Sequence, residues 1–333
     1  MFRKIFATIV ALCLTLAFVG CNALSGGQTA NNDKKISIIT SSFPPYDFAN
    51  QIVGDLAEVT MLLPPGGDSH SYEPSLKDMA KISNADIFIY VGGESDVWVD
   101  RILSTVDTSN MKIITLMDCV EVVEEEIKEG MTTDEHDHDE HDDHDGHYEH
   151  KHDNTEHEPE YDEHVWTSPR NAVLIVEKIT SALLNLDDNS SEYLKNKLAY
   201  IDKLTELDHE FTEIVAYSKR KTIVFGDRFP FRYFVEAYGL DYYAAFPGCS
   251  DDTEPSIKTV SFLIDKVKTE KIPVVFHAEM GNVKMATTIA KDAGAEVRQF
   301  HACHNISKDE FTAGVSYIDI MKENAKVLKE ALN

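Results

Sequence analysis

The sequence contains few cysteines and has a deficit of positive charge. Five cysteines occur among 333 residues and none forms a CxxC pair, so a structural zinc finger and a thioredoxin-type motif are both excluded. Lysine and arginine number 31 against 58 aspartates and glutamates, for a formal net charge of -27. This balance argues against nucleic acid or an anionic membrane surface as the main partner, and cations are the natural ligands.

Common catalytic sequence motifs are also missing. No HExxH, GxSxG or P-loop pattern occurs, and the nearest case, His209-Glu210-Phe211-Thr212-Glu213, ends in the wrong residue. We therefore expect a protein that is not an enzyme.

A single apolar run, residues 5–19, follows two basic residues near the N-terminus. It is short for a membrane span but suits a secretory signal. The run ends in Ala-Phe-Val-Gly-Cys, which resembles a bacterial lipobox and implies a lipoprotein signal peptide over residues 1–20 with lipid on Cys21. Residues 21–34 then form a flexible tether. We expect an extracytoplasmic protein anchored to the outer face of the cytoplasmic membrane, with plain secretion as the alternative.

Three cysteines remain in the mature chain: Cys119, Cys249 and Cys303. An oxidising exterior permits a disulfide between Cys249 and Cys303, which fall in the same half of the sequence. Reduced, buried thiols are the alternative.

The segment from Asp134 to His164 holds nine of the fourteen histidines among many acidic residues. It has almost no apolar side chain to bury, so we expect a disordered loop, residues 131–163, that scavenges metal. Imidazole is a good ligand for zinc, copper, nickel and iron.

Strand and helix patterns alternate on both sides of this segment. Four strands are predicted near residues 35–40, 59–63, 85–91 and 112–116, and four more near 221–225, 240–245, 273–276 and 296–301. Helical periods lie between them, and the pattern of residues 191–217 predicts a helix about 40 Å long. The sequence thus predicts an α/β protein of two Rossmann-like lobes with mostly parallel sheets, joined by a long spine helix.

We expect an N-terminal lobe over residues 35–168, linking helices over 169–219 and a C-terminal lobe over 220–333. Because ligands of such sheets bind at the carboxyl ends of strands, the cleft between the lobes is the predicted site.

Two histidines follow predicted strands in loops with a nearby aromatic and a proline. His70 lies in the string Gly-Gly-Asp-Ser-His-Ser-Tyr-Glu-Pro, and His164 lies in Asp-Glu-His-Val-Trp-Thr-Ser-Pro. These motifs, in this order around a histidine-rich loop, resemble the solute-binding proteins of zinc and manganese ABC transporters, the ZnuA/TroA type. The resemblance covers essentially the whole mature chain and implies that His70 and His164 are metal ligands.

The resemblance does not by itself assign the metal ligands of the C-terminal lobe. A usual ligand position falls on Arg228, which cannot bind a cation. Asp227 is one substitute, and Arg228 is expected to orient a ligating carboxylate instead.

Farther along the chain, His301 lies near the place where related proteins carry a last carboxylate, and Glu279 matches a glutamate of the family. We expect a site of His70, His164 and His301, closed by Glu279, Asp227, His304 or a water, with His304 and Cys303 as rivals of His301.

Three imidazoles favour Zn²⁺, with Mn²⁺ as the alternative. The resemblance implies a monomeric receptor that delivers zinc to the membrane permease and ATPase of an ABC transporter. A zinc-dependent hydrolytic enzyme and an extracellular zinc reservoir or adhesin stay open.

Overall fold

The computed structural model describes residues 35–69, 71–131, 160–186, 189–248, 250, 254–281 and 283–333. The expected signal peptide, the tether, Cys21, His70, Cys249 and nearly all of the histidine-rich loop lie outside the described residues. Ile36–Asn333 forms one compact unit. In the described part of the chain, no helix has the length and apolar character needed to cross a membrane.

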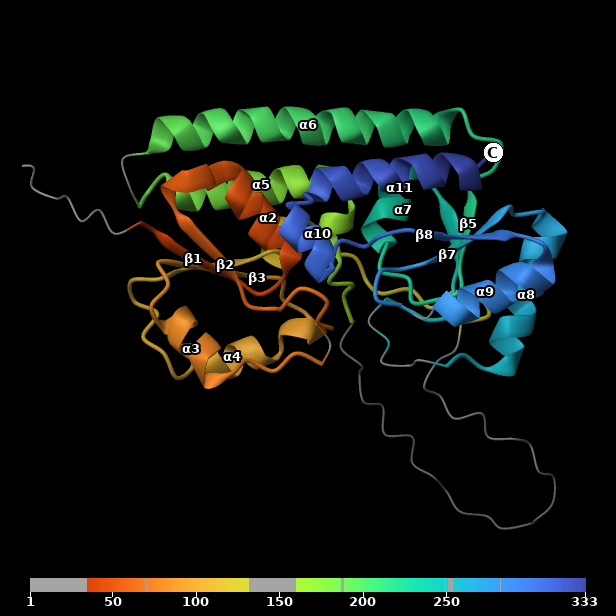
Figure 1. Ribbon diagram of the computed structural model, residues 1–333, viewed down its shortest axis with the longest axis horizontal. Coiled ribbons are helices and arrows are strands. Elements are labelled where there is room, and N and C mark those ends of the chain that lie inside the picture. Colours follow the sequence, from red (N-terminus) through yellow and green to blue (C-terminus); the bar gives the residue numbers. More distant parts are fainter. Residues whose placement is uncertain are drawn as a thin grey trace, which may run out of the picture. The chain divides into compact units, whose positions relative to one another are not determined.

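The N-terminal lobe is built on a four-stranded parallel sheet (Figure 1). Its strands lie in the order β2-β1-β3-β4, where β1 is Ser37–Thr40, β2 is Glu58–Met61, β3 is Ile87–Tyr90 and β4 is Lys112–Thr115. The connections contain α2 (Phe43–Val53), α3 (Leu76–Ser83) and α4 (Trp98–Leu103). Parallel pairing requires such crossovers, because the chain must return to the same end of the sheet.

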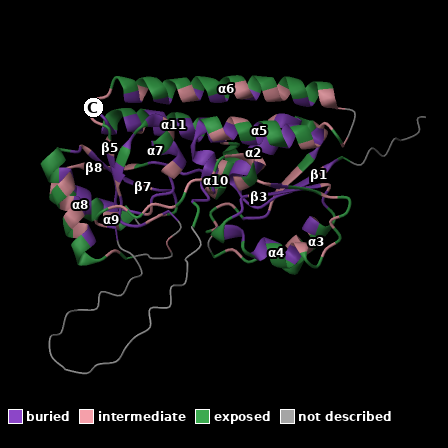
Figure 2. Ribbon diagram, turned by 180° about the vertical axis from the view of Figure 1, so that it is seen from behind, coloured by how far each residue is buried: buried purple, intermediate pink, exposed green. Residues whose placement is uncertain are grey.

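The C-terminal lobe repeats this topology. Its sheet has the order β6-β5-β7-β8, where β5 is Thr222–Phe225, β6 is Asp241–Tyr243, β7 is Val274–His277 and β8 is Glu296–Gln299. Its helices are α7 (Arg232–Tyr238), α8 (Ile257–Glu270), α9 (Val283–Ala293), α10 (Lys308–Ala313) and α11 (Tyr317–Ala331). In both sheets the two central strands are mostly buried and the edge strands more exposed (Figure 2). The predicted two-lobed α/β fold is confirmed.

Two helices link the lobes: α5 (Pro169–Leu183) and α6 (Ser190–Ala216). The 27 residues of α6 extend for about 40 Å at 1.5 Å per residue, and the helix packs on α2, α5 and α11. Six buried side chains mark its inner stripe: Tyr193, Tyr200, Leu204, Leu207, Phe211 and Val215. They join a hydrophobic core that runs through both lobes, so the two sheets rest on shared packing.

Some details differ from the sequence pattern. Leu194 and Leu198 fit the predicted apolar period of α6 but are exposed, because the helix packs along one narrow stripe only. Helices α4 and α10 have six residues each, too few to show a helical period in the sequence.

The segment before the histidine-rich loop contacts the C-terminal lobe. The backbone N–H of Val123 donates to Tyr233 Oη at 3.3 Å, and Lys128 pairs with Asp241 at 3.0 Å. The boundary predicted at residue 168 stays a prediction, but contacts between the lobes begin well before it.

Candidate metal centre

A cavity of about 410 Å³ lies at the carboxyl ends of strands from both sheets. The loop after β2 contributes Gly67, Asp68 and Ser69, and the segment after the histidine-rich loop contributes His164. The loops after the four C-terminal strands contribute the remaining lining residues, which include Asp227, Arg228, Gly248, Glu279, Ala302 and His304. This is the position at which open α/β sheets bind their ligands.

His164 is fully buried at the start of a short 3₁₀ turn, Val165–Thr167. Asp162 Oδ1 accepts from the His164 backbone N–H at 2.8 Å and lies 3.2 Å from Nδ1. Burial lowers the pKa of His164, but the charges of Asp162 and Glu163 outweigh it, so the net pKa is raised. A carboxylate on Nδ1 fixes the ring and leaves Nε2 available to bind a metal.

His304 brings a second imidazole to the cavity from the loop after β8. Its ring centroid lies 5.3 Å from that of His164, and Trp166 packs on both rings at 5.5 and 5.0 Å. The Trp166 indole N–H donates to the Ala302 carbonyl at 2.6 Å, which ties the two loops together. Ligand atoms of Glu163, His164 and His304 all lie within 4.8 Å of one another. This is a donor set of the kind that zinc prefers.

Glu163 is held by the N-terminal lobe. Its carboxylate accepts from the Ser95 backbone N–H at 2.9 Å and from the Ser95 hydroxyl. Gly93, at φ +73°, passes so close that a Cβ there would lie 2.7 Å from Glu163 Oε2. Glycine is therefore required beside this carboxylate.

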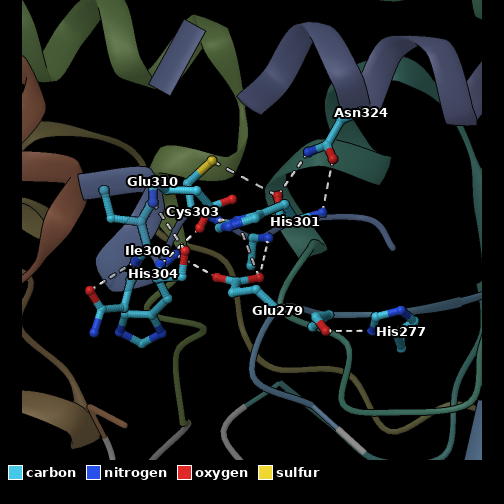
Figure 3. Close-up of polar contacts among 12 residues, drawn as sticks. His277, Glu279, His301, Cys303, His304, Ile306, Glu310 and Asn324 are labelled. Atoms are coloured by element: carbon cyan, nitrogen blue, oxygen red, sulfur yellow. Dashed lines mark hydrogen bonds and ion pairs between the residues drawn. The ribbon is translucent and has the colours of Figure 1, made fainter. Parts of the chain in front are cut away.

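Glu279 supports the loop that carries His304 (Figure 3). Its Oε2 accepts from the Ala302 N–H at 2.6 Å and its Oε1 from the His304 N–H at 2.8 Å. The intervening Cys303 has a left-handed φ of +61°, unusual for a residue with a side chain. Both carboxylate oxygens thus hold the backbone in a conformation that presents His304 to the cavity.

His301 also supports this loop. Its Nδ1 accepts from the Cys303 N–H at 2.9 Å and lies 3.5 Å from Glu279 Oε2. Asn324 accepts from the His301 backbone N–H and donates to its carbonyl, both at 2.8 Å (Figure 3). Among the described residues that line the cavity, His304 is present and His301 is not.

Asp227 and Arg228 lie on the C-terminal wall. Asp227 accepts from the Arg228 N–H at 2.9 Å and from the Ala278 N–H at 3.1 Å, and burial raises its pKa. A Cβ on Gly281 would fall 1.8 Å from Asp227 Oδ2, so a larger residue there would displace the Asp227 carboxylate.

The predicted site residues are thus separated by the structure into two groups. His164 and His304 converge, whereas Glu279, which also lines the cavity, and His301 hold the loop that carries His304. Cys303 is buried, and burial raises the pKa of its thiol. Cys249 lies outside the described residues, so the disulfide that the sequence permits between Cys249 and Cys303 stays a prediction. Asp162, Glu163 and Trp166 were not predicted as site residues, although they surround His164 in its motif.

Fold and cavity together define a two-lobed α/β binding protein with a metal-type donor set between its lobes. The family model described as zinc-uptake complex component A, periplasmic (ZnuA) matches residues 38–331, and the chain belongs to this family.

Two relatives and one solved structure illustrate the similarity. The zinc-binding lipoprotein AdcA of Streptococcus pneumoniae (strain ATCC BAA-255 / R6) is 33% identical over 330 residues, which are 98% of this chain but 61% of that protein. The high-affinity zinc uptake system protein ZnuA of Bacillus subtilis is 31% identical and is covered over 96% of its length, with 97% of this chain. The crystal structure of the Zn(II)-bound ZnuA-like domain of S. pneumoniae AdcA has a TM-score of 0.70 at 31% identity and covers 90% of this chain and 99% of that domain.

Proposed function

We propose that the protein is the extracytoplasmic solute-binding component of an ABC transporter, which captures Zn²⁺ between its lobes and delivers it to a membrane permease. The convergence of His164, His304 and Glu163 to within 4.8 Å carries this proposal. The names of the similar proteins support it, since both relatives are described as zinc-binding or zinc-uptake proteins.

The proposed ligands are His164 and His304, with His70 as the third imidazole. His70 lies outside the described residues, and its assignment rests on its motif and on Ser69, the preceding residue, which lines the cavity. Imidazole donors favour zinc over manganese, which prefers oxygen ligands. Glu163 is the carboxylate that lies within 4.8 Å of both histidines and is our candidate for a fourth position, although its hydrogen bonds to Ser95 compete for that role.

The remaining parts of the proposal concern location and partners. A lipid on Cys21 would hold the receptor at the outer face of the cytoplasmic membrane, where a permease and its ATPase could receive the ion. The histidine-rich segment would raise the local zinc concentration beside the cavity. On this proposal the protein acts as a monomeric receptor and performs no chemistry on its cargo.

Calorimetric titration of the purified, metal-free protein with zinc tests the proposal. We expect one tight site, and we expect His164→Ala and His304→Ala each to weaken it by more than about a hundredfold, because loss of a residue that merely supports a ligand already costs about ten- to a hundredfold. His209→Ala is the matched control, since His209 is exposed on α6 and contacts Glu213 only loosely, at 3.7 Å. Unchanged affinity in both cavity variants would refute the site.

A further inference from the structure

A positively charged side chain lines the cavity that we propose binds a cation. Arg228 is half-buried and lines the same cavity as His164 and His304. Among the described residues, none accepts a hydrogen bond from its side chain or forms an ion pair with it; its backbone N–H donates to Asp227, and its charge opposes the rise that burial causes in the pKa of that carboxyl. A guanidinium does not lose its proton at physiological pH, so a bound dication would be repelled by this charge.

Three of the carboxylates around the cavity are already engaged by the protein. Glu279 accepts from two backbone N–H groups, Asp227 accepts from two others, and Glu163 accepts from Ser95. Each of these bonds would weaken if the carboxylate turned toward Arg228. A group from outside the protein can balance the charge of the guanidinium without weakening these bonds. Asp68, the remaining acidic residue of the lining, is the competing partner within the protein.

The cavity has room for such a group. Its volume of about 410 Å³ far exceeds the roughly 10–15 Å³ that a cavity needs in order to hold one water molecule. A metal ion with a small planar anion fits within this space.

We propose that the cavity takes up its dication together with a small oxyanion, either a carboxylate or bicarbonate, which bridges the metal and Arg228. One oxygen of the anion ligates the metal, and the other accepts a charge-assisted hydrogen bond from the guanidinium, a geometry that suits the fork of arginine. Because the anion lies between Arg228 and the metal ion, it attracts both positive charges, and this attraction offsets their mutual repulsion. This inference rests on the proposed zinc-binding function.

The test measures zinc affinity by competition with a chromophoric chelator, first with perchlorate as the sole anion and then with millimolar acetate or millimolar bicarbonate. We expect either anion to tighten zinc binding of the native protein about tenfold, the gain from one charge-assisted hydrogen bond. Arg228→Gln should bind zinc in perchlorate at least as tightly as the native protein, because the repulsion is gone, and should gain nothing from the anions. A response to acetate alone or bicarbonate alone identifies which oxyanion the cavity accepts.

Two further variants control for charge and for folding. Arg232→Gln removes the same charge at a residue that does not line the cavity, where Arg232 faces Glu126 at 3.6 Å, and it should respond to anions as the native protein does. Arg228→Lys keeps the positive charge and should retain part of the anion response even if Arg228→Gln folds poorly.

Two results would overturn the inference. One is weaker zinc binding by Arg228→Gln in perchlorate with no anion effect in the native protein, which would mean that Arg228 supports a protein carboxylate such as Asp68, another lining residue. The other is an anion effect that persists in Arg228→Gln. Failure of the native protein to bind zinc in any of the buffers would overturn the proposed function itself, and this inference with it.

Discussion

His164 and His304 meet edge to face, with ring centroids 5.3 Å apart and ring planes at 89°, although they come from opposite halves of the chain. Trp166 packs against both rings and hydrogen-bonds to the loop that carries His304. The two donors are therefore held by packing as well as by their own loops. Such fixed side chains favour tight and selective metal binding, because little conformational entropy is lost when the ion arrives.

We predict that Asp162→Asn weakens zinc binding about tenfold at neutral pH, because it removes the carboxylate that orients His164 and raises its pKa. The same change should extend zinc binding to lower pH, since protons then compete less strongly for the ring. Zinc titrations across a pH series measure both effects. Asp208→Asn, which removes a carboxylate paired with Arg170 away from the cavity, should change neither. If zinc affinity fell in Asp162→Asn but its dependence on pH matched that of the native protein, this role of Asp162 would be contradicted.

We predict that Glu279→Gln lowers zinc affinity by about ten- to a hundredfold without removing a metal ligand. A glutamine can accept only one of the two backbone N–H bonds that Glu279 accepts, so the loop before His304 should loosen. Cobalt substitution gives the measurement, because the visible spectrum of Co²⁺ reports its ligands.

The spectrum of this variant should match that of the native protein at saturating cobalt. Glu330→Gln, which removes an exposed carboxylate paired with Arg298, is the matched control and should leave both affinity and spectrum unchanged. A changed spectrum in Glu279→Gln would mean that Glu279 binds the metal itself.

We predict that Asp47 makes the protein less stable as the pH rises. Its carboxylate accepts from Tyr200 Oη at 3.1 Å and from the Tyr317 N–H at 3.2 Å, and burial raises its pKa from 3.8 to about 6. Because the folded state holds this proton more tightly than the unfolded chain, the free energy of unfolding should fall by about 3 kcal/mol as the pH rises from about 4 through 6.

Urea unfolding at several pH values checks this dependence. Asp47→Asn keeps an acceptor for these donors and should remove the decline, whereas Asp118→Asn, at an exposed position, should leave it in place. An Asp47→Asn variant with the native pH dependence would show that another group is responsible.

We predict that deleting residues 134–158 leaves one tight zinc site. The two ends of this segment are held together by the described residues: the Glu125 N–H donates to the Glu160 carbonyl at 2.9 Å, and the Asp162 N–H donates to the Val123 carbonyl at 3.0 Å. Metal analysis and calorimetry should show fewer weakly bound ions and an unchanged cavity affinity. A second variant keeps the native length but carries serine in place of every histidine of the segment. It should show the same loss of weakly bound ions and the same unchanged cavity affinity. Loss of all bound zinc would instead locate the site in the segment.

Local patterns predicted the architecture well. The strands β1 and β3 are short apolar runs, and the inner stripe of α6 follows a helical period, so both can be read from neighbouring residues. The motif of His164 is equally local, because the residues that orient and pack the ring lie within two positions of it.

The neighbouring residues in the sequence could not show whether His301 or His304 lines the cavity. The two histidines are three residues apart in one loop, and both are plausible donors by type. Glu279, from the loop after β7, fixes the backbone at residues 302 and 304, and the left-handed turn at Cys303 then separates the two rings. One ring faces the cavity while the other supports the loop.

The sequence by itself therefore determined the two-lobed α/β fold, the long linking helix and the metal-binding character of the protein, because periodicity, charge and motif composition are properties of adjacent residues. Only the tertiary structure decided which side chains share the cavity. That depends on contacts between loops from β2, β5, β7 and β8, which lie far apart in the chain and come together because parallel strands end at one edge of each sheet.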